Sequence, residues 1–245
     1  LKRPKRPDLI YDHHFGQPGA PTILFLAGYR SYRTGSKAMA FAEWVQNTSF
    51  GYVRFDYSGH GESGGVFADL TLSDWVQDAE DICAQVLGPG PILLVGSSMG
   101  GWIALILALR HPDRIRGIVG IAAAPDFTVS FEQSLTPAER AEMAQNGYIA
   151  IGSTLGPDPY ILTEKLLNDG RQHLVLTETH TLATPMVLFQ GALDPAVSPD
   201  TPTRIARAFP NAPVKIMMIP DGDHGLSRPE DLRKTFHATQ TLLYR

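Results

Sequence analysis

The chain has 245 residues, of which 43% are hydrophobic and 19% are charged, values typical of a folded globular domain and far from those of a disordered chain. The formal net charge of −4 at pH 7 excludes the strongly basic surface that nucleic-acid binding requires, so we expect no nucleic-acid partner. No apolar run approaches the roughly 20 residues that span a bilayer, and we identify no signal peptide, so we expect no membrane span and a cytoplasmic location, although a start at Leu1 leaves room for a removed leader.

The first elements alternate between short apolar runs and helical patterns. The chain opens with a basic run, LKRPKRP over residues 1–7, which we interpret as a solvated terminal arm without an assigned function. The alternation that follows indicates βαβ units and a mostly parallel sheet with helices on both faces. Continuous apolar runs are expected where both faces of a strand are buried. Six strands are predicted in this way: Ile23–Gly28, Gly51–Asp56, Ile92–Gly96, Gly117–Ala122, Met186–Gln190 and Lys215–Ile219.

Residues 72–87 have apolar side chains at three- and four-residue spacing, which is typical of an amphipathic helix. Thr71, with Asp74 three residues later, resembles the capping box of such a helix. Cys83 lies in the apolar stripe, so we expect a buried thiol. Because it is the only cysteine, it cannot form an intramolecular disulfide, which fits a reducing compartment.

The alternation lapses between residues 128 and 184, where a helix start at Thr136 is followed by Gly- and Pro-rich loops and short helical patterns. A connection of this length is unusual for a bare loop in a compact domain. We therefore predict a small helical cap insertion over 128–184, and a core formed by residues 1–127 and 185–245.

The strongest local signal is Gly-Ser-Ser-Met-Gly over residues 96–100, a G-x-S-x-G motif between a predicted strand and a predicted helix. A nucleophile elbow of this kind holds its central serine in a strained turn, and the flanking glycines relieve crowding. We predict that Ser98 is a catalytic nucleophile rather than a structural turn residue. The helix that begins there points its free N–H groups at the reaction site, so we expect the backbone N–H of Met99 to bind the oxyanion.

A second oxyanion donor should come from the turn after the first strongly apolar strand, and we select the backbone N–H of Tyr29. Gly28 would let the backbone approach the substrate carbonyl closely, although it also fits a simple turn. We also predict that Gly28, Arg30 and Tyr32 contact the substrate, with the Tyr29 side chain beside them.

A serine hydroxyl needs a neighbouring base that accepts its proton. We assign that role to His224, in a turn-rich segment after the last predicted strand, with His60 as its rival. Asp194, at the end of a predicted strand, is the acid expected to orient the imidazole. Asp126 is the alternative acid, and an Asx turn or a helix cap is the structural alternative for Asp194.

The residues just described resemble those of a known group of enzymes. Four runs carry the resemblance: FLAGYRSY over 25–32, GSKA over 35–38, RFDYSG over 54–59 and GSSMGGW over 96–102. They are similar to mammalian mitochondrial α/β-hydrolases described as mycophenolic acid acyl-glucuronide esterases and as acyl-protein thioesterases. The resemblance implies an α/β-hydrolase fold and a capped serine hydrolase that acts on acyl groups. It is weaker over the predicted cap, which commonly shapes the pocket, so the substrate is not carried over. Mitochondrial targeting is not carried over either, because we identify no leader in the sequence.

These observations predict a serine hydrolase that cleaves a small-molecule acyl ester or thioester through an acyl-enzyme intermediate, without a metal or an organic cofactor. The sequence fixes neither the acyl-chain length nor the oligomeric state. Two other classes remain as alternatives. One is a cofactor-free haloperoxidase or perhydrolase that uses the same three residues, and the other is a non-catalytic binding protein of the same fold.

Overall fold

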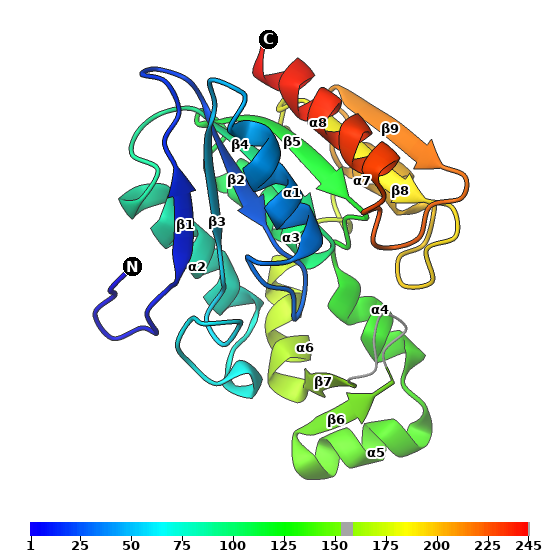
Figure 1. The fold of residues 1–245 in the computed structure, drawn as a ribbon. Coiled ribbons are helices and arrows are strands. Elements are labelled where there is room, and N and C mark those ends of the chain that lie inside the picture. The colour runs from blue at the N-terminus through cyan, green and yellow to red at the C-terminus, as the bar shows by residue number, and fades with distance from the viewer. Residues whose placement is uncertain (153–158, 245) are drawn as a thin grey trace.

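A seven-stranded sheet forms the centre of the computed structural model, which describes residues 1–152 and 159–244 (Figure 1). The strand order is β1-β3-β2-β4-β5-β8-β9, and every neighbouring pair is parallel except β1 with β3. All six predicted strands are present, with ends that differ from the prediction by at most two residues, and β1 is an additional strand of this sheet. The strands are β1 (Tyr11–His14), β2 (Thr22–Leu26), β3 (Gly51–Phe55), β4 (Ile92–Ser97), β5 (Ile115–Ile121), β8 (Met186–Gly191) and β9 (Val214–Ile219).

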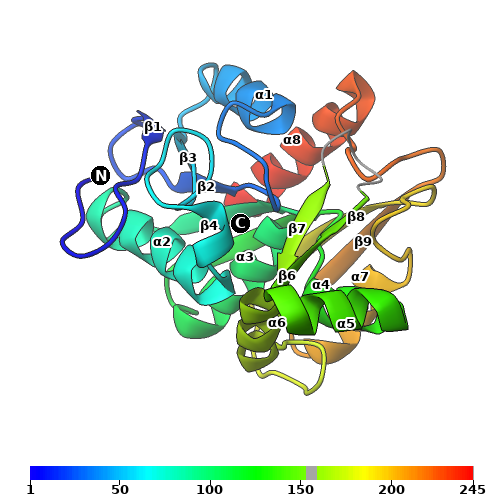
Figure 2. The same cartoon turned by 90° about the horizontal axis from the view of Figure 1, so that it is seen from below.

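Helices cover both faces of this sheet, as the alternation predicted. Helices α1 (Ser36–Val45) and α8 (Pro229–Leu243) lie on one face (Figures 1 and 2). Helices α2 (Leu72–Gln85), α3 (Met99–Arg110) and α7 (Thr201–Ala208) lie on the other face. Strands β2, β4 and β5 are buried almost throughout, because helices exclude water from both of their faces.

Helix α2 confirms the amphipathic helix and the capping box that were predicted from residues 71–87. A short 3₁₀ helix, η1 (Phe67–Asp69), precedes it, and the Asp74 carboxylate accepts a hydrogen bond of 3.0 Å from the backbone N–H of Thr71 at its start. The apolar stripe faces the core, and Cys83 is 5% exposed. Burial raises the pKa of this thiol to about 12, so it is protonated and unreactive at neutral pH.

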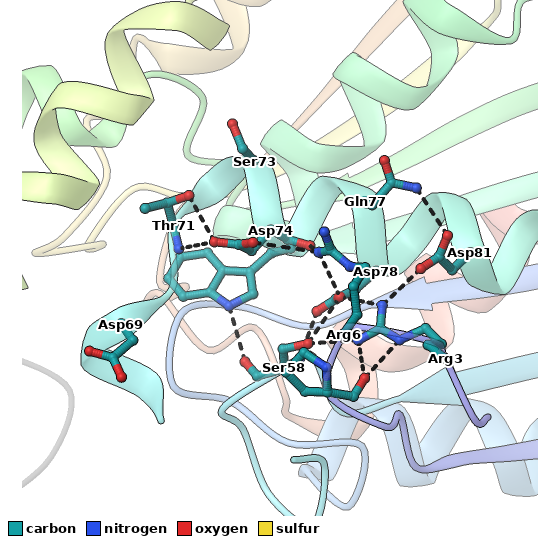
Figure 3. Close-up of polar contacts among 12 residues, drawn as sticks. Arg3, Arg6, Ser58, Asp69, Thr71, Ser73, Asp74, Gln77, Asp78 and Asp81 are labelled. Atoms are coloured by element: carbon teal, nitrogen blue, oxygen red, sulfur yellow. Dashed lines mark hydrogen bonds and ion pairs between the residues drawn. The ribbon is translucent and has the colours of Figure 1, made fainter. Parts of the chain in front are cut away.

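The prediction of a solvated N-terminal arm is wrong for its two arginines, Arg3 and Arg6, which bind the acidic side of α2 (Figure 3), whereas Lys2 and Lys5 are exposed. The Arg3 side chain is 2% exposed, and its guanidinium donates hydrogen bonds to Asp78 at 2.6 Å and to Asp81 at 2.9 Å. Arg6 lies 3.5 Å from the Asp74 carboxylate. These partners are more than sixty residues away in the chain, so the local charge pattern could not indicate them.

Helices α4, α5 and α6 and the strand pair β6–β7, all between β5 and β8 in the chain, lie beyond the carboxyl ends of the parallel strands (Figure 1). Thr136 caps α5, as predicted, through a hydrogen bond of 3.2 Å from the Glu139 N–H. The antiparallel pair β6–β7 was not predicted. Within the described ranges, no helix is long and apolar enough to cross a membrane. The segment between β5 and β8 contains α4 (Phe127–Ser134), α5 (Pro137–Asn146), β6 (Tyr148–Ile151), β7 (Tyr160–Thr163), α6 (Glu164–Gly170) and a 3₁₀ helix, η2 (Arg171–His173).

Candidate active site

Each of the predicted site residues lies in the segment that follows the carboxyl end of a parallel strand. These ends meet at one edge of the sheet, where α/β proteins bind their ligands. The turn at residues 28–32 follows β2, and His60 follows β3. Ser98 follows β4 directly, while Asp194 and His224 follow β8 and β9. The topology therefore brings these distant segments to the same edge.

Ser98 occupies the strained turn that the motif predicts. Its backbone has φ 53° and ψ −119°, outside the conformations that a residue with a side chain prefers. Two hydrogen bonds to the neighbouring strand region fix it: its N–H donates to the Ile121 carbonyl and its carbonyl accepts from the Ala124 N–H, both at 3.0 Å. The hydroxyl is thereby held at the amino end of α3.

The two glycines of the motif are required by close backbone approaches. A Cβ atom on Gly96 would lie 2.4 Å from the Gly100 carbonyl oxygen. A Cβ atom on Gly100 would lie 2.0 Å from the Leu26 carbonyl oxygen at the end of β2. Since atoms cannot approach this closely, any side chain at either position would displace the turn that carries Ser98.

The two predicted oxyanion donors belong to segments next to Ser98. A Cβ atom on Gly28 would be 3.2 Å from the Ser98 Cβ, so the turn that contains Tyr29 touches the nucleophile directly. Met99 is the first residue of α3, and the N–H groups of a first helical turn have no partner within the helix. Among the described residues, no acceptor takes a hydrogen bond from the backbone N–H of Tyr29 or of Met99. Their role as donors stays a prediction.

His224 and Asp194 form a buried pair. Nδ1 of His224 lies 2.8 Å from Oδ2 of Asp194, and both residues are less than 10% exposed. A carboxylate can only accept, so Nδ1 carries the hydrogen and Nε2 is left to act as a base. Burial alone would raise the pKa of the Asp194 carboxyl. Hydrogen bonds from His224 and from the N–H groups of Val197 and Ala196 outweigh burial and hold this pKa below its ordinary value.

Gln190 is a site residue that the sequence analysis missed. It is fully buried at the end of β8, and its amide donates to Asp194 Oδ2 at 3.0 Å. Asp194 Oδ1 meanwhile accepts from the backbone N–H groups of Ala196 and Val197, at 2.8 and 2.9 Å. The carboxylate is thus held on both oxygens. A polar residue that ends an otherwise apolar strand was the available signal.

Lys37, also missed, ties the His224 loop to the start of α1. Its ammonium donates to the Gly225 carbonyl at 2.7 Å. Burial lowers the pKa of this amine, and the nearby Asp223 carboxylate opposes the effect. The loop therefore reaches from β9 back to the element that follows β2. In this conformation, no hydrogen bond among the described residues joins the Ser98 hydroxyl to the His224 ring.

The alternative base and the alternative acid are both engaged elsewhere. Both ring nitrogens of His60 contact backbone groups, Nδ1 the Ser58 carbonyl at 3.1 Å and Nε2 the Arg30 N–H at 3.2 Å. The Asp126 carboxylate accepts from the N–H groups of Val175 and Leu176, both at 2.9 Å. These contacts give the two residues structural partners, whereas Asp194 contacts His224.

The side chains predicted to contact substrate differ in their surroundings. The Tyr29 hydroxyl donates to the Ile161 carbonyl of β7 at 2.6 Å, and the Arg30 guanidinium donates to the Pro159 carbonyl. These two side chains join the turn after β2 to the segment between β5 and β8. Tyr32 is 45% exposed. Their contact with substrate stays a prediction.

Comparison with known proteins agrees with this architecture. The family model described as "Serine aminopeptidase, S33" matches residues 20–153. The mitochondrial palmitoyl-protein thioesterase ABHD10 of Rattus norvegicus is 30% identical over 95% of this chain and 77% of its own length. The sn-1-specific diacylglycerol lipase ABHD11 of Mus musculus is 26% identical over 91% of this chain and 82% of its own length.

Solved structures show the same fold over almost the whole chain. The α/β-hydrolase domain-containing protein 10 from mouse superposes with a TM-score of 0.91 at 28% identity, covering 99% of this chain and 96% of the other. The crystal structure of a protein from Agrobacterium vitis S4 described as a "Putative hydrolase" superposes with a TM-score of 0.93 at 37% identity. The match covers 97% of this chain and 94% of the other. The predicted α/β-hydrolase fold is confirmed.

Proposed function

Because this chain belongs to the family described as serine aminopeptidase S33, and is therefore a hydrolase of the α/β-hydrolase fold, we propose that it cleaves acyl esters or thioesters through an acyl-enzyme on Ser98. The observation that carries the proposal is the bonded His224–Asp194 pair, which lies at the same sheet edge as the strained Ser98. A module that only binds ligands would not need a serine, a histidine and a buried carboxylate in this arrangement.

In the proposed first step, Nε2 of His224 removes the proton from the Ser98 hydroxyl as its oxygen attacks the acyl carbon. The carbonyl oxygen becomes an oxyanion, which accepts hydrogen bonds from the N–H groups of Tyr29 and Met99. Hydrogen bonds of this kind often tighten only in the substrate complex. We therefore expect the contact between Ser98 and His224 to form when substrate binds.

The first half ends when His224 gives its proton to the departing alcohol or thiol, which leaves the acyl group bonded to the Ser98 oxygen. In the second half, a water molecule loses a proton to His224 and attacks the acyl carbon. His224 then returns this proton to the Ser98 oxygen as its bond to the acyl carbon breaks, which releases the acid product and the free serine. Asp194 stays ionised and stabilises the imidazolium in both halves. Its lowered pKa supports this role.

The substrate class rests on the relatives and on the segment over residues 128–184. Proteins named as a palmitoyl-protein thioesterase and a diacylglycerol lipase both act on acyl groups. In this proposal, residues 128–184 act as a cap over the core of 1–127 and 185–245, and Gly28, Arg30 and Tyr32 contact the substrate. The thioesterase relatives are named as mitochondrial, so the cytoplasmic location stays a prediction.

A substrate panel tests this proposal. Turnover of p-nitrophenyl esters of graded chain length is compared with that of an acyl-CoA and an S-acylated cysteine peptide. Hydrogen peroxide is supplied in a parallel series to measure peracid formation. We expect hydrolysis of esters or thioesters by the wild type and none above background by Ser98→Ala. Peracid formation in excess of hydrolysis would favour the perhydrolase alternative, and full activity of Ser98→Ala would overturn the proposal.

A further inference from the structure

His60 is buried between two turns of the site edge, with only 2% of the residue exposed. Its Nδ1 faces a carbonyl oxygen, that of Ser58, which can only accept a hydrogen bond. Its Nε2 faces a backbone N–H, that of Arg30, which can only donate. The ring is therefore neutral, with its hydrogen on Nδ1, and it has no free nitrogen for proton transfer.

The backbone N–H of Arg30, which donates a hydrogen bond to His60, belongs to a strained turn. Arg30 has φ 56°, a left-handed conformation that is uncommon for a residue with a side chain. The turn is closed by one further backbone hydrogen bond, from the Ser31 N–H to the Gly28 carbonyl at 3.0 Å. The Tyr29 N–H shares a planar peptide unit with the Gly28 carbonyl, and the bond to His60 fixes the next peptide unit. The two bonds together therefore set the direction in which the Tyr29 N–H points.

Ser58, the other partner of His60, is held in turn by a buried ion pair (Figure 3). Its N–H and its hydroxyl donate to the Asp78 carboxylate at 2.7 and 3.0 Å. The Arg3 guanidinium contacts both Asp78, at 2.6 Å, and the Ser58 hydroxyl, at 2.9 Å. The Ser58 carbonyl also accepts from the Trp75 indole at 3.1 Å. A residue of the N-terminal arm is thus connected, step by step, to the turn beside Ser98.

We propose that His60 is a positioning residue that aims the Tyr29 N–H at the oxyanion, and that the Arg3–Asp78 ion pair anchors it through Ser58. This inference rests on the proposed function, because an oxyanion forms only if Ser98 attacks an acyl carbon. Loss of a whole oxyanion donor lowers kcat by about 10²- to 10³-fold in other serine hydrolases. A donor that remains but is misdirected should cost part of that, on the order of 10-fold, with little change in KM.

Two substitutions at the same position separate the two contacts of the ring. In His60→Gln, the amide oxygen can reach the place of Nε2 and accept the Arg30 N–H. In His60→Asn, the amide nitrogen can take the place of Nδ1 and donate to Ser58, but nothing accepts the Arg30 N–H. We expect His60→Gln to keep kcat within about threefold of wild type and His60→Asn to lose about 10-fold or more, with KM within about twofold in both.

Affinity for a boronic acid provides a second readout. A boronic acid forms a covalent adduct with Ser98, and one of its oxygens occupies the oxyanion position. If His60 had only a structural role, its two variants would not differ selectively in this affinity. It should weaken in His60→Asn in proportion to kcat and be largely kept in His60→Gln. Equal losses in the two folded variants, or wild-type values in His60→Asn, would overturn the inference.

A second pair of variants applies if the His60 variants do not fold. Arg3→Gln removes the guanidinium at the far end of the network. Lys2→Gln removes a charge from the same N-terminal arm, and the Lys2 side chain is 92% exposed. We expect Arg3→Gln to lower both kcat and boronic acid affinity and Lys2→Gln to leave both unchanged. Wild-type values in folded Arg3→Gln would overturn the inference. Full activity of Ser98→Ala would instead show that the proposed function itself has failed.

Discussion

Oδ2 of Asp194 lies 2.8 Å from Nδ1 of His224, and it is this contact that leaves the opposite ring nitrogen free to accept a proton. We predict that Asp194→Asn lowers kcat by about 10⁴-fold, because an amide can stabilise neither the required tautomer nor the imidazolium. Asp126→Asn is the matched control, since that carboxylate binds the N–H groups of Val175 and Leu176. It should keep kcat within about tenfold of wild type. The reverse pattern in steady-state kinetics would assign the acid to Asp126.

Gln190 should influence the pKa of the Asp194 carboxyl. Its amide donates to Asp194 Oδ2 at 3.0 Å, so Gln190→Met removes one hydrogen bond and should lower kcat/KM by less than about tenfold. Gln190→Glu places a second carboxyl beside Asp194. Two adjacent carboxylates raise the pKa of one of them, so the acid limb of the kcat/KM profile should move to higher pH. Profiles of both variants that coincide with the wild-type profile would show that Gln190 has no influence on Asp194.

Gly28 has little room for a side chain. Its Cβ would lie 3.2 Å from the Ser98 Cβ, so the two residues would have to move apart by a few tenths of an ångström. A displacement of about 1 Å in such a site can cost about 100-fold in rate, so we expect Gly28→Ala to lower kcat by about 10-fold. Gly90→Ala, where the added Cβ meets nothing within 4 Å, is the control and should be indistinguishable from wild type. Equal kinetics for both variants would remove Gly28 from the site.

The buried ring of His60 should make stability depend on pH. Burial lowers its pKa from 6.5 to about 4, with Asp56 opposing the shift and Arg30 adding to it. Below pH 6.5 the unfolded chain therefore binds a proton that the folded chain does not, so stability falls as the pH falls, and the loss is complete below about pH 4. The contribution is about 3 kcal/mol.

Urea unfolding of wild type and His60→Gln at several pH values measures this contribution by difference. The wild type should lose more stability than the variant between pH 6.5 and about 4. Parallel curves would show that His60 protonates equally in both states.

The central strands could be predicted because they are buried on both faces and so appear as continuous apolar runs. Strand β9 is partly exposed at the sheet edge but is also an apolar run. Strand β1 was missed because it lies at the sheet edge and reads Tyr-Asp-His-His, with no apolar pattern. Ser98, Asp194 and His224 could be proposed because each follows an element with a clear local pattern. Arg3 and Lys37 could not, since their partners, Asp78 and Gly225, are distant in the chain and only the fold brings them together.

If the Ser98 oxygen is the nucleophile, a fluorophosphonate should add to it, and the mass of the protein after the reaction measures this addition. We expect a single adduct per chain, located on Ser98 by peptide mapping, absent from Ser98→Ala and formed far more slowly in His224→Ala. An adduct on another residue, or undiminished labelling of Ser98→Ala, would contradict this assignment of the nucleophile.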